Sequence, residues 1–239
     1  MIAKLLEPYK NRIVYFSGDK TLDYRSLIVS EEDVNLGRVV VPRNRMVIGE
    51  QTQSDHIHPA VEKDSGSGFI PGKPRIPIAD GFVTQTENLF LCVRSADCVP
   101  ILLFDPVTVT VGIVHCGREG TRKNAIGAAI RLFSTGFNAQ MTDILAVVAP
   151  MICEKHYEVD ESTFLKFEQD TGVTQNFPCL DLRGTVHQQL LHAGVLDKNI
   201  EHQRICTYED ENYFSYRRDG TKNRQIFVIG IYNEQNIRK

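Results

Sequence analysis

The sequence predicts an α+β fold: a single domain in which mixed β-sheets are covered by helices. Three patterns support this. Buried strand runs fill residues 88–117, a helical stripe of apolar residues follows at 125–133, and helices then alternate with strands without a strict βαβ repeat. The chain has 239 residues, of which 42% are hydrophobic, so it can bury one large core without disulfides or metals. We therefore expect residues 1–239 to form one domain.

The first third of the chain predicts short strands and one long loop. Segments 12–18 (RIVYFSG) and 37–51 (GRVVVPRNRMVIGEQ) are rich in β-branched residues, and a Pro-Arg-Asn turn divides the second. Segment 62–77 (EKDSGSGFIPGKPRIP) combines Gly, Ser and Pro, which predicts a loop of the kind that is often functional or mobile. Because the β pattern resumes directly after it, we expect an excursion within the one domain.

Segment 88–117 predicts the centre of a sheet. The runs LFLCV, VPILLF and VTVGIVH are almost continuously apolar, which is typical of strands buried on both faces. Asp105-Pro106 predicts a turn between the last two runs. We therefore expect strands 99–104 and 109–114 to pair as a hairpin.

The rest of the chain predicts helices that alternate with strands. A helix within 118–137 has a stripe of apolar residues with a 3.6-residue period and a C-cap at Gly136. Strand DILAVVAP follows, and then two helices, ESTFLKFEQDTG and RGTVHQQLLHAGV, which end at Gly172 and near Gly194. The final strand is RQIFVIGIY.

Composition and charge exclude several classes of protein. The net charge is -3 and no basic stripe is present, so we expect no nucleic-acid partner. No apolar run approaches ~18 residues, so we expect no membrane span. The N-terminal MIAKLLEPYKNR lacks the pattern of a signal peptide, and the six cysteines lack CxxC spacing. We therefore expect a cytoplasmic protein whose cysteines are thiols.

Two chemically capable residues flank the predicted hairpin. Cys98 lies in SADCVP before its first strand, and His115 lies in IVHCGREG at the end of its second. Hairpin pairing brings positions 98 and 115 together. Such a pair could be a thiolate nucleophile with its base, or two ligands of a zinc ion that keeps an open position. The structural alternative is a buried thiol beside a core histidine.

Two further features suggest ligand binding. In QTQSDHIHPA, His56 and His58 lie two residues apart, so an extended chain would point both rings to one face, as metal ligands or as ordinary polar residues. The helix that starts at GREGT could bind an anion at its N-terminus, with charge from Arg118 and from Arg217 in YFSYRRDG.

Several separated motifs resemble the laccase-domain family, also called the multicopper polyphenol oxidoreductase family. They extend from about residue 37 to the C-terminus and read SADCVPILLFDP, GIVHCG, PMICEKHYEVD, LDLRGTVHQQLLHAGV, ICTY and YFSYRRDG. The resemblance implies phosphorolysis of purine nucleosides, deamination of adenosine, and an α/β/β/α layered fold. It also implies a zinc cofactor held by two histidines and a cysteine, with a purine nucleoside and phosphate as substrates.

The family's residues transfer by position with two departures. Its cysteine falls on Cys98 and its second histidine on His115, whereas its first histidine falls on Gln53, an amide that is a poor zinc ligand. In HCGREG, Glu119 replaces a family arginine, and Arg118 could supply the charge instead. SYRRDG is intact from Ser215, which implies substrate contacts by Ser215 and Arg217. A turn at Ser54-Asp55 could bring His56 in as the missing ligand, although simple strand register points it away.

Three functions follow. The first is a purine nucleoside phosphorylase with adenosine deaminase activity, zinc-dependent but with a divergent metal site. It uses Cys98, His115 and Gln53 for catalysis. The second is a weakened or inactive paralogue that binds a nucleoside or a partner. The third is a cysteine hydrolase with Cys98 as nucleophile and His115 as base. Copper-dependent phenol oxidation ranks low, because seven scattered histidines do not supply a multicopper centre.

Overall fold

The computed structural model describes residues 2–237, which form two main sheets and a small ribbon. The first sheet has the order β1 (Ile13–Ser17), β12 (Gln225–Ile231), β7 (Phe90–Ser95), β4 (Met46–Ile48). The second has the order β11 (Ile200–His202), β10 (Leu145–Val148), β8 (Val99–Asp105), β9 (Thr110–Cys116), β6 (Gly81–Thr84), β5 (Ile57–Pro59). Strands β2 (Val34–Asn35) and β3 (Val40–Val41) form the ribbon.

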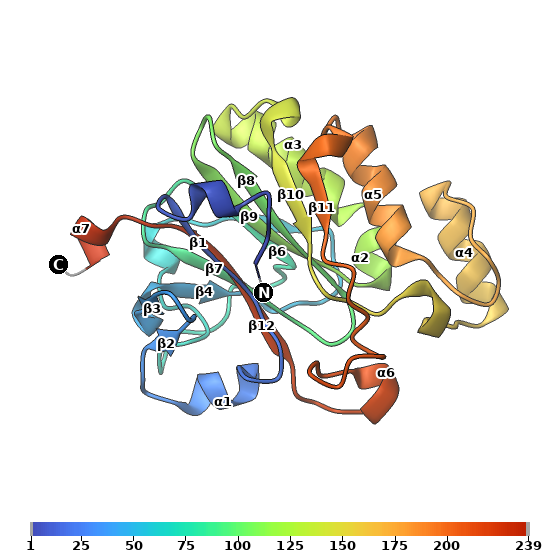
Figure 1. The fold of residues 1–239 in the computed structure, drawn as a ribbon, viewed down its shortest axis with the longest axis horizontal. Coiled ribbons are helices and arrows are strands. Elements are labelled where there is room, and N and C mark those ends of the chain that lie inside the picture. Colours follow the sequence, from blue (N-terminus) through green and yellow to red (C-terminus); the bar gives the residue numbers. More distant parts are fainter. Residues whose placement is uncertain (1, 238–239) are drawn as a thin grey trace.

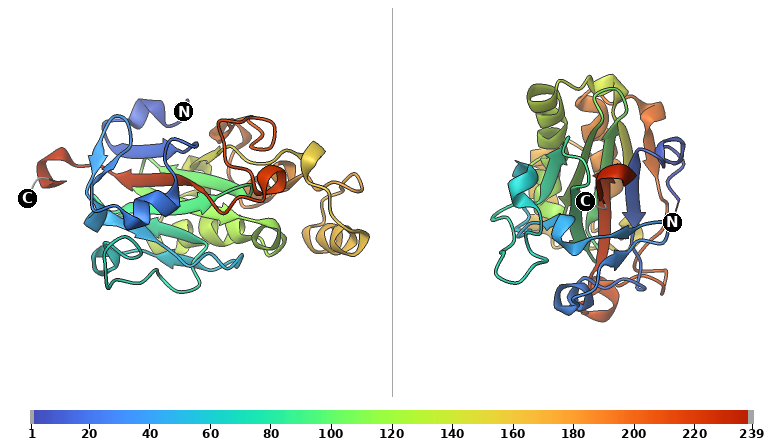
Figure 2. Two further views of the ribbon diagram at one scale, coloured as in Figure 1. Left: turned by 90° about the horizontal axis from the view of Figure 1, so that it is seen from below. Right: turned by 90° about the vertical axis from the view of Figure 1, so that its left-hand side faces the viewer.

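The two sheets pack face to face (Figures 1 and 2). Long helices cover the outer face of the second sheet, whereas one short helix, the ribbon and the loop over residues 62–77 cover that of the first. The helices are α1 (Tyr24–Val29), α2 (Arg118–Arg122), α3 (Ala125–Phe137), α4 (Glu161–Thr171), α5 (Leu182–His192), α6 (Tyr216–Asp219) and α7 (Glu234–Ile237). Alternation along β8 shows the layering, because Leu102 and Phe104 face the other sheet while Ile101 and Leu103 face α3 and α5. The expected α+β class with helix-covered mixed sheets is confirmed, and the layers run α/β/β/α.

The predicted hairpin is confirmed and is slightly longer than expected. Strands β8 and β9 pair antiparallel over their whole length, from Val99 opposite Cys116 to Asp105 opposite Thr110. Asp105 begins the turn, since its carboxylate accepts hydrogen bonds from Val107 N and Thr108 Oγ1. Both strands are buried throughout, as their apolar runs predict.

The single helix expected within 118–137 is wrong, because the chain forms α2 and α3 there. Asn124 between them has a φ of +61°, which an α-helix cannot contain, and its side chain accepts a hydrogen bond from Gly127 N as the N-cap of α3. Helix α3 also passes Gly136 and ends at the left-handed Asn138. The other two expected helices are α4, capped by Gly172, and α5.

The loop over residues 62–77 is packed against β4. Gly66 N donates to Met46 O, Ile48 N to Ser67 O and Ile76 N to Ile48 O, while Phe69 is buried in the core outside the first sheet. Gly66 and Gly68 have positive φ, which allows the tight turns. Across residues 2–237, no helix has both the length and the apolar content to cross a bilayer.

Candidate active site

A cavity of about 470 Å³ lies at the end of the hairpin that carries Cys98 and His115. This volume is in the range of small-molecule pockets. Its walls come from the segment between β7 and β8, the loop after β4, the loop after β10 and the start of α6. The lining residues are Gln51, Gln53, Arg94, Ser95, Ala96, Asp97, Cys98, His115, Ile152, Tyr157, Leu182, Tyr216, Arg217 and Arg224.

Cys98 and His115 meet at the base of this cavity, as the hairpin predicts. Position 98 directly precedes the Val99–Cys116 pair, and His115 lies opposite Pro100. Cys98 is half-buried and His115 is buried. Burial alone would lower the pKa of His115, but the charge of Cys98 and hydrogen bonds with Asp80 and Cys98 raise it to about 9.

Asp97, the residue before Cys98, joins the cavity walls. Its carboxylate accepts hydrogen bonds from Thr207 Oγ1 at 2.7 Å and from Arg217 N at 2.8 Å. Its carbonyl oxygen accepts from Ile152 N at 3.1 Å. Asp97 therefore holds three segments, distant in sequence, around Cys98: two through its carboxylate and one through its backbone carbonyl.

Asp80 is the organising residue that the sequence reasoning missed. It is fully buried and accepts from His115 Nδ1 at 3.0 Å, while its carbonyl accepts from His115 N at 2.7 Å. The same carboxylate accepts from the backbone N–H groups of Thr52, Gln53 and Ser54 and from the Ser54 hydroxyl. Burial favours the neutral acid, yet these bonds, His115 first, lower the pKa of Asp80. The Asp80 carboxylate thus fixes both the His115 ring and the loop over residues 52–54.

Gln53 lies at the mouth of the cavity, next to Cys98. A Cβ atom added to Gly117 would lie 3.1 Å from Cys98 Sγ and 3.4 Å from the Gln53 amide oxygen, so both side chains border Gly117. The extended register assumed for residues 51–58 is wrong at Gln53, whose φ is +58°. The loop adopts this turn because Asp80 binds three consecutive N–H groups.

The two histidines of the HIH stretch lie outside the cavity lining. His56 is exposed, and His58 Nε2 donates to Asp64 Oδ2 at 3.0 Å, a pair that does not line the cavity. A turn is present before them, but it does not bring His56 to Cys98 and His115. His56 as a metal ligand therefore has no support in this geometry.

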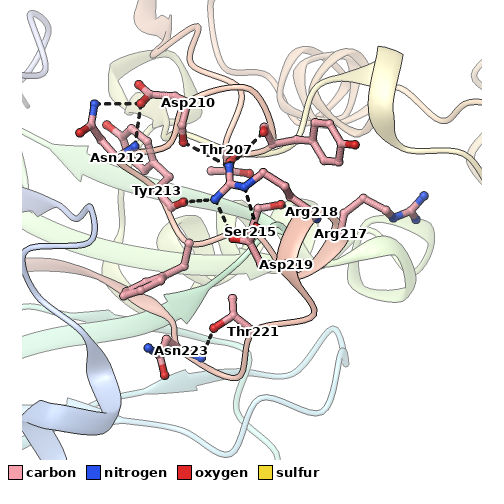
Figure 3. A network of polar contacts seen from close by, with 12 residues as sticks. Thr207, Asp210, Asn212, Tyr213, Ser215, Arg217, Arg218, Asp219, Thr221 and Asn223 are labelled. Carbon is pink, nitrogen blue, oxygen red and sulfur yellow. Dashed lines mark hydrogen bonds and ion pairs between the residues drawn. The ribbon is translucent and has the colours of Figure 1, made fainter.

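Arg217 lines the cavity, whereas Ser215 and Arg218 hold its helix. Ser215 is buried and caps α6, since its Oγ accepts from Arg218 N at 3.1 Å. Arg218 donates to the carbonyls of Thr207 and Tyr213, and Arg217 points away from this network (Figure 3). The Arg217 guanidinium instead lies over the Tyr157 ring, 5.1 Å from its centre.

Arg118 and Glu119 lie beside the cavity and not in its lining. Glu119 pairs with Arg122 at 2.8 Å and with Arg118 at 3.3 Å, and Arg122 also pairs with Asp170. These partners lower the pKa of Glu119 despite its partial burial. The reversed charge at position 119 is therefore neutralised locally and does not face the cavity.

Arg94 and Arg224 are further cavity cations that the sequence reasoning missed. Arg94 Nη1 is buried and has no hydrogen-bond partner among the described residues. Burial, with the charges of Arg75 and Arg224, lowers the pKa of Arg94. Gln51 holds the strand in place, because its amide exchanges hydrogen bonds with Arg94 N and O. The only sequence signal was one arginine in the apolar run LFLCVRSADC.

Cys98, His115 and Gln53 are the residues that could hold the implied zinc. Because His115 donates from Nδ1 to Asp80, its Nε2 remains for a metal, which is the usual carboxylate–histidine–metal arrangement. Thiolate and imidazole are strong zinc ligands, whereas an amide oxygen is weak. The donors therefore offer zinc two strong ligands and one weak one.

Comparisons with known proteins agree with the motifs. The family described as multi-copper polyphenol oxidoreductase laccase matches residues 17–232. "Purine nucleoside phosphorylase ORF3" of Streptomyces griseus is 36% identical over 62% of this chain and 61% of its own length. "Purine nucleoside phosphorylase YlmD" of Geobacillus stearothermophilus is 30% identical over 81% of this chain and 74% of its own length. The match thus spans less than two thirds of the Streptomyces protein.

Solved structures share the fold. YlmD from Geobacillus stearothermophilus superposes with a TM-score of 0.75 at 30% identity, and Bacillus licheniformis "hypothetical protein YfiH" with 0.73 at 31%. Each match covers 80% of this chain and 75% of the other. Together with the family match over residues 17–232, they show that the chain belongs to the multi-copper polyphenol oxidoreductase laccase family.

Proposed function

We propose that the chain is a purine nucleoside phosphorylase that also deaminates adenosine, with its active site in the cavity at Cys98 and His115. In the first reaction a phosphate oxygen bonds to C1′ of the ribose and the C1′–N bond breaks. The bonding electrons leave with the purine, which takes up a proton, and ribose 1-phosphate forms. In the second, water replaces the amino group of adenosine and ammonia is released. The names of the relatives support the phosphorylase reaction.

The observation that carries the proposal is a set of three arginines beside the Cys98–His115 pair. Arg94, Arg217 and Arg224 line one cavity, and the buried Arg94 Nη1 has no partner among the described residues. A buried guanidinium nitrogen without a partner is costly unless an anion binds to it. A planar guanidinium suits phosphate, so phosphate is the substrate group that we assign to these arginines.

The other cavity residues hold and orient the reacting groups. Asp80 keeps the proton of His115 on Nδ1 and directs Nε2 toward Cys98 and the cavity. Gln53 offers an amide at the mouth, where it can bind a hydroxyl or a base edge. Zinc on Cys98 and His115 would polarise a water or substrate oxygen when bound. Arg118 and Ser215 do not contact the substrate in this proposal. Arg118 pairs with Glu119 and neutralises its charge, and Ser215 caps α6, which carries Arg217.

The test is to incubate the purified protein with inosine or adenosine, with and without phosphate and with zinc supplied. Chromatography then measures free base, ribose 1-phosphate and inosine. Phosphate-dependent release of base that Cys98→Ala abolishes is the expected result. Stabilisation by nucleoside without any product would instead indicate the binding-only paralogue, and no turnover above Cys98→Ala would refute the enzyme. We also propose a cytoplasmic location, to which its six free thiols are suited.

One observation favours a second candidate, a cysteine hydrolase. Cys98, His115 and Asp80 follow the order nucleophile, base and orienting carboxylate, with 3.0 Å between His115 Nδ1 and Asp80 Oδ1. A hydrolase of this kind needs a reactive thiolate and no metal. Rapid alkylation of Cys98 by iodoacetamide at neutral pH in zinc-free protein, without nucleoside turnover, would favour it. Slow alkylation would exclude it.

A further inference from the structure

A second group of metal-binding side chains lies behind the cavity wall, next to the lining residues Ile152 and Tyr157 and apart from Cys98 and His115. It consists of Cys153, His156, Cys206 and Glu209, whose ligand atoms all lie within 4.8 Å of one another. Among the described residues, this is the one set of three or more such side chains that meets this condition. Glu209 Oε1 accepts from His156 Nε2 at 2.9 Å and from Cys153 Sγ at 3.8 Å.

The backbone holds the two ligand pairs against each other. Met151 and Cys206 form a parallel bridge, Thr207 N donates to Met151 O at 3.0 Å, and Cys153 N donates to Cys206 Sγ at 3.2 Å. This joins the loop after β10 to the loop after β11. The four side chains therefore meet because of pairing between backbone segments, and not through flexible surface side chains.

Each pair has a spacing of three residues across one tight turn. Cys153 caps the 3-10 helix Glu154–His156, and His156 N donates to Cys153 O at 3.2 Å. Cys206 and Glu209 repeat this, since Glu209 N donates to Cys206 O at 3.2 Å. In such a turn, side chains three apart point the same way. C-x2-H and C-x2-E therefore present two ligands each, as in structural zinc sites.

We propose that Cys153, His156, Cys206 and Glu209 bind a zinc ion in a structural site. Two sulfurs, one imidazole nitrogen and one carboxylate oxygen complete a tetrahedron, which leaves no position for substrate. Zinc is the first-row divalent ion that best fits a mixed tetrahedral set with two thiolates.

The surroundings suit the charge and the geometry of this site. Two thiolates and a carboxylate around zinc leave a net charge of about -1. Arg183 and Arg204 border the depression beside Cys153, Cys206 and Glu209, where they offset that charge. The His156 ring stacks on Tyr208, with centroids 4.3 Å apart, which restricts the ring's orientation.

The consequence of the site is to brace the cavity wall. Ile152 and Tyr157, on either side of the Cys153–His156 turn, both line the cavity. Thr207, next to Cys206, donates to Asp97 beside Cys98. A zinc ion there would fix these contacts without touching substrate, so it is a structural ion separate from the weak Cys98–His115 site.

The test measures zinc in untagged protein by plasma mass spectrometry, after loading with zinc and dialysis. The Cys98→Ala background removes the other site. In this background we expect about one equivalent of zinc, which Cys153→Ser or Cys206→Ser removes and the matched control Cys179→Ser retains. Cobalt added to the zinc-free Cys98→Ala protein should give thiolate-to-metal charge-transfer absorption, which Cys153→Ser abolishes.

Glu209→Gln keeps the test informative if a cysteine variant does not fold, because Glu209 is exposed. We expect this variant to lose zinc to a chelator at least tenfold faster than Cys98→Ala alone. Three results would each overturn the proposal. They are no zinc in Cys98→Ala, equal zinc retention in folded Cys153→Ser and Cys179→Ser, or a Cys153–Cys206 disulfide in freshly purified protein.

Discussion

Replacing Asp80 by asparagine tests the central arrangement of the site, because the amide keeps the shape of the carboxylate and removes one acceptor. Oδ2 accepts from Thr52 N, Ser54 N and Ser54 Oγ, and Oδ1 accepts from Gln53 N and His115 Nδ1. An amide nitrogen at the Oδ2 position would face two backbone donors. At the Oδ1 position it would face one backbone donor and an imidazole that can change its tautomer, so we expect the second orientation.

Two effects of different size follow from this orientation. The partly buried N–H of Gln53 loses its acceptor, which costs about 1–3 kcal/mol of stability at most. That loss corresponds to a fall in Tm of roughly 2–4 °C per kcal/mol for a protein of this size. Loss of the Asp80 charge lowers the pKa of His115, and the neutral ring then carries its proton on Nε2, which can neither accept a proton nor bind a metal. The same swap in a Ser-His-Asp triad costs roughly 10⁴-fold in kcat, and we expect a fall of about 10²–10⁴-fold here.

The assay compares urea unfolding with kcat/KM for nucleoside phosphorolysis. Asp64→Asn is the matched control, since Asp64 also accepts from a histidine, His58 at 3.0 Å, and from the N–H of Val61, but outside the cavity lining. It should lose stability and keep activity per folded molecule. A folded Asp80→Asn protein with wild-type kcat/KM would refute the role assigned to Asp80, as would equal losses of activity in both variants.

Three further outcomes follow from the same structure. Arg94→Met should raise the KM for phosphate by roughly 10–150-fold, the value of a charge-assisted hydrogen bond, with little change in the KM for nucleoside. The matched control is Arg75→Met, because Arg75 lies over the ring of Tyr24, as Arg94 does, but does not line the cavity. It should leave the KM for phosphate and the KM for nucleoside unchanged, and an equal rise in the KM for phosphate in both variants would contradict the phosphate assignment. Gly112→Ala puts a Cβ atom 2.6 Å from the ring of Phe133 in α3 and should lower the free energy of unfolding, measured in urea, by about 1–3 kcal/mol. Gly136 is exposed, so Gly136→Ala should leave that free energy unchanged or raise it. Burial, and then the charges of neighbouring side chains, lower the pKa of His202 to about 4. As the pH falls, His202 therefore takes up a proton in the unfolded chain at a higher pH than in the folded chain. Its contribution to stability is therefore complete above about pH 6.5 and is lost as the pH falls toward 4, and the urea midpoint of His202→Gln should fall less over that window than that of the wild type.

The hairpin and the pair at its end could be predicted because they depend on local information. Two apolar runs and one Asp-Pro turn determine that Cys98 and His115 end at the same edge of the sheet. The turn can be predicted from residues 105 and 106 alone, without the rest of the chain. Gln53 could be assigned to the same site only through resemblance, since no local pattern connects it to the hairpin.

Asp80 and Arg94 could not be predicted in the same way. Asp80 lies 35 residues from His115 and reaches it because β6 pairs with β9, a contact between strands distant in sequence. Its neighbours in the sequence, IPIADGF, resemble any strand entry. Arg94 looks like an ordinary end of a buried strand until the folded chain brings Tyr24 and the other cavity residues around its side chain. The break at Asn124 likewise depends on a backbone conformation that apolar periodicity does not report.

The crowding of Arg94, Arg217 and Arg224 around one cavity makes the stability of this protein depend on the salt in which it is measured. Like charges that are held close together raise the free energy of the folded state. An anion that binds the folded but not the unfolded state stabilises the fold by RT ln(1+[L]/Kd). This amounts to about 2.7 kcal/mol at a hundredfold excess over Kd. The choice of phosphate, sulfate or a neutral amine as buffer is therefore a thermodynamic variable, and variants that remove one of these arginines would lose part of that sensitivity.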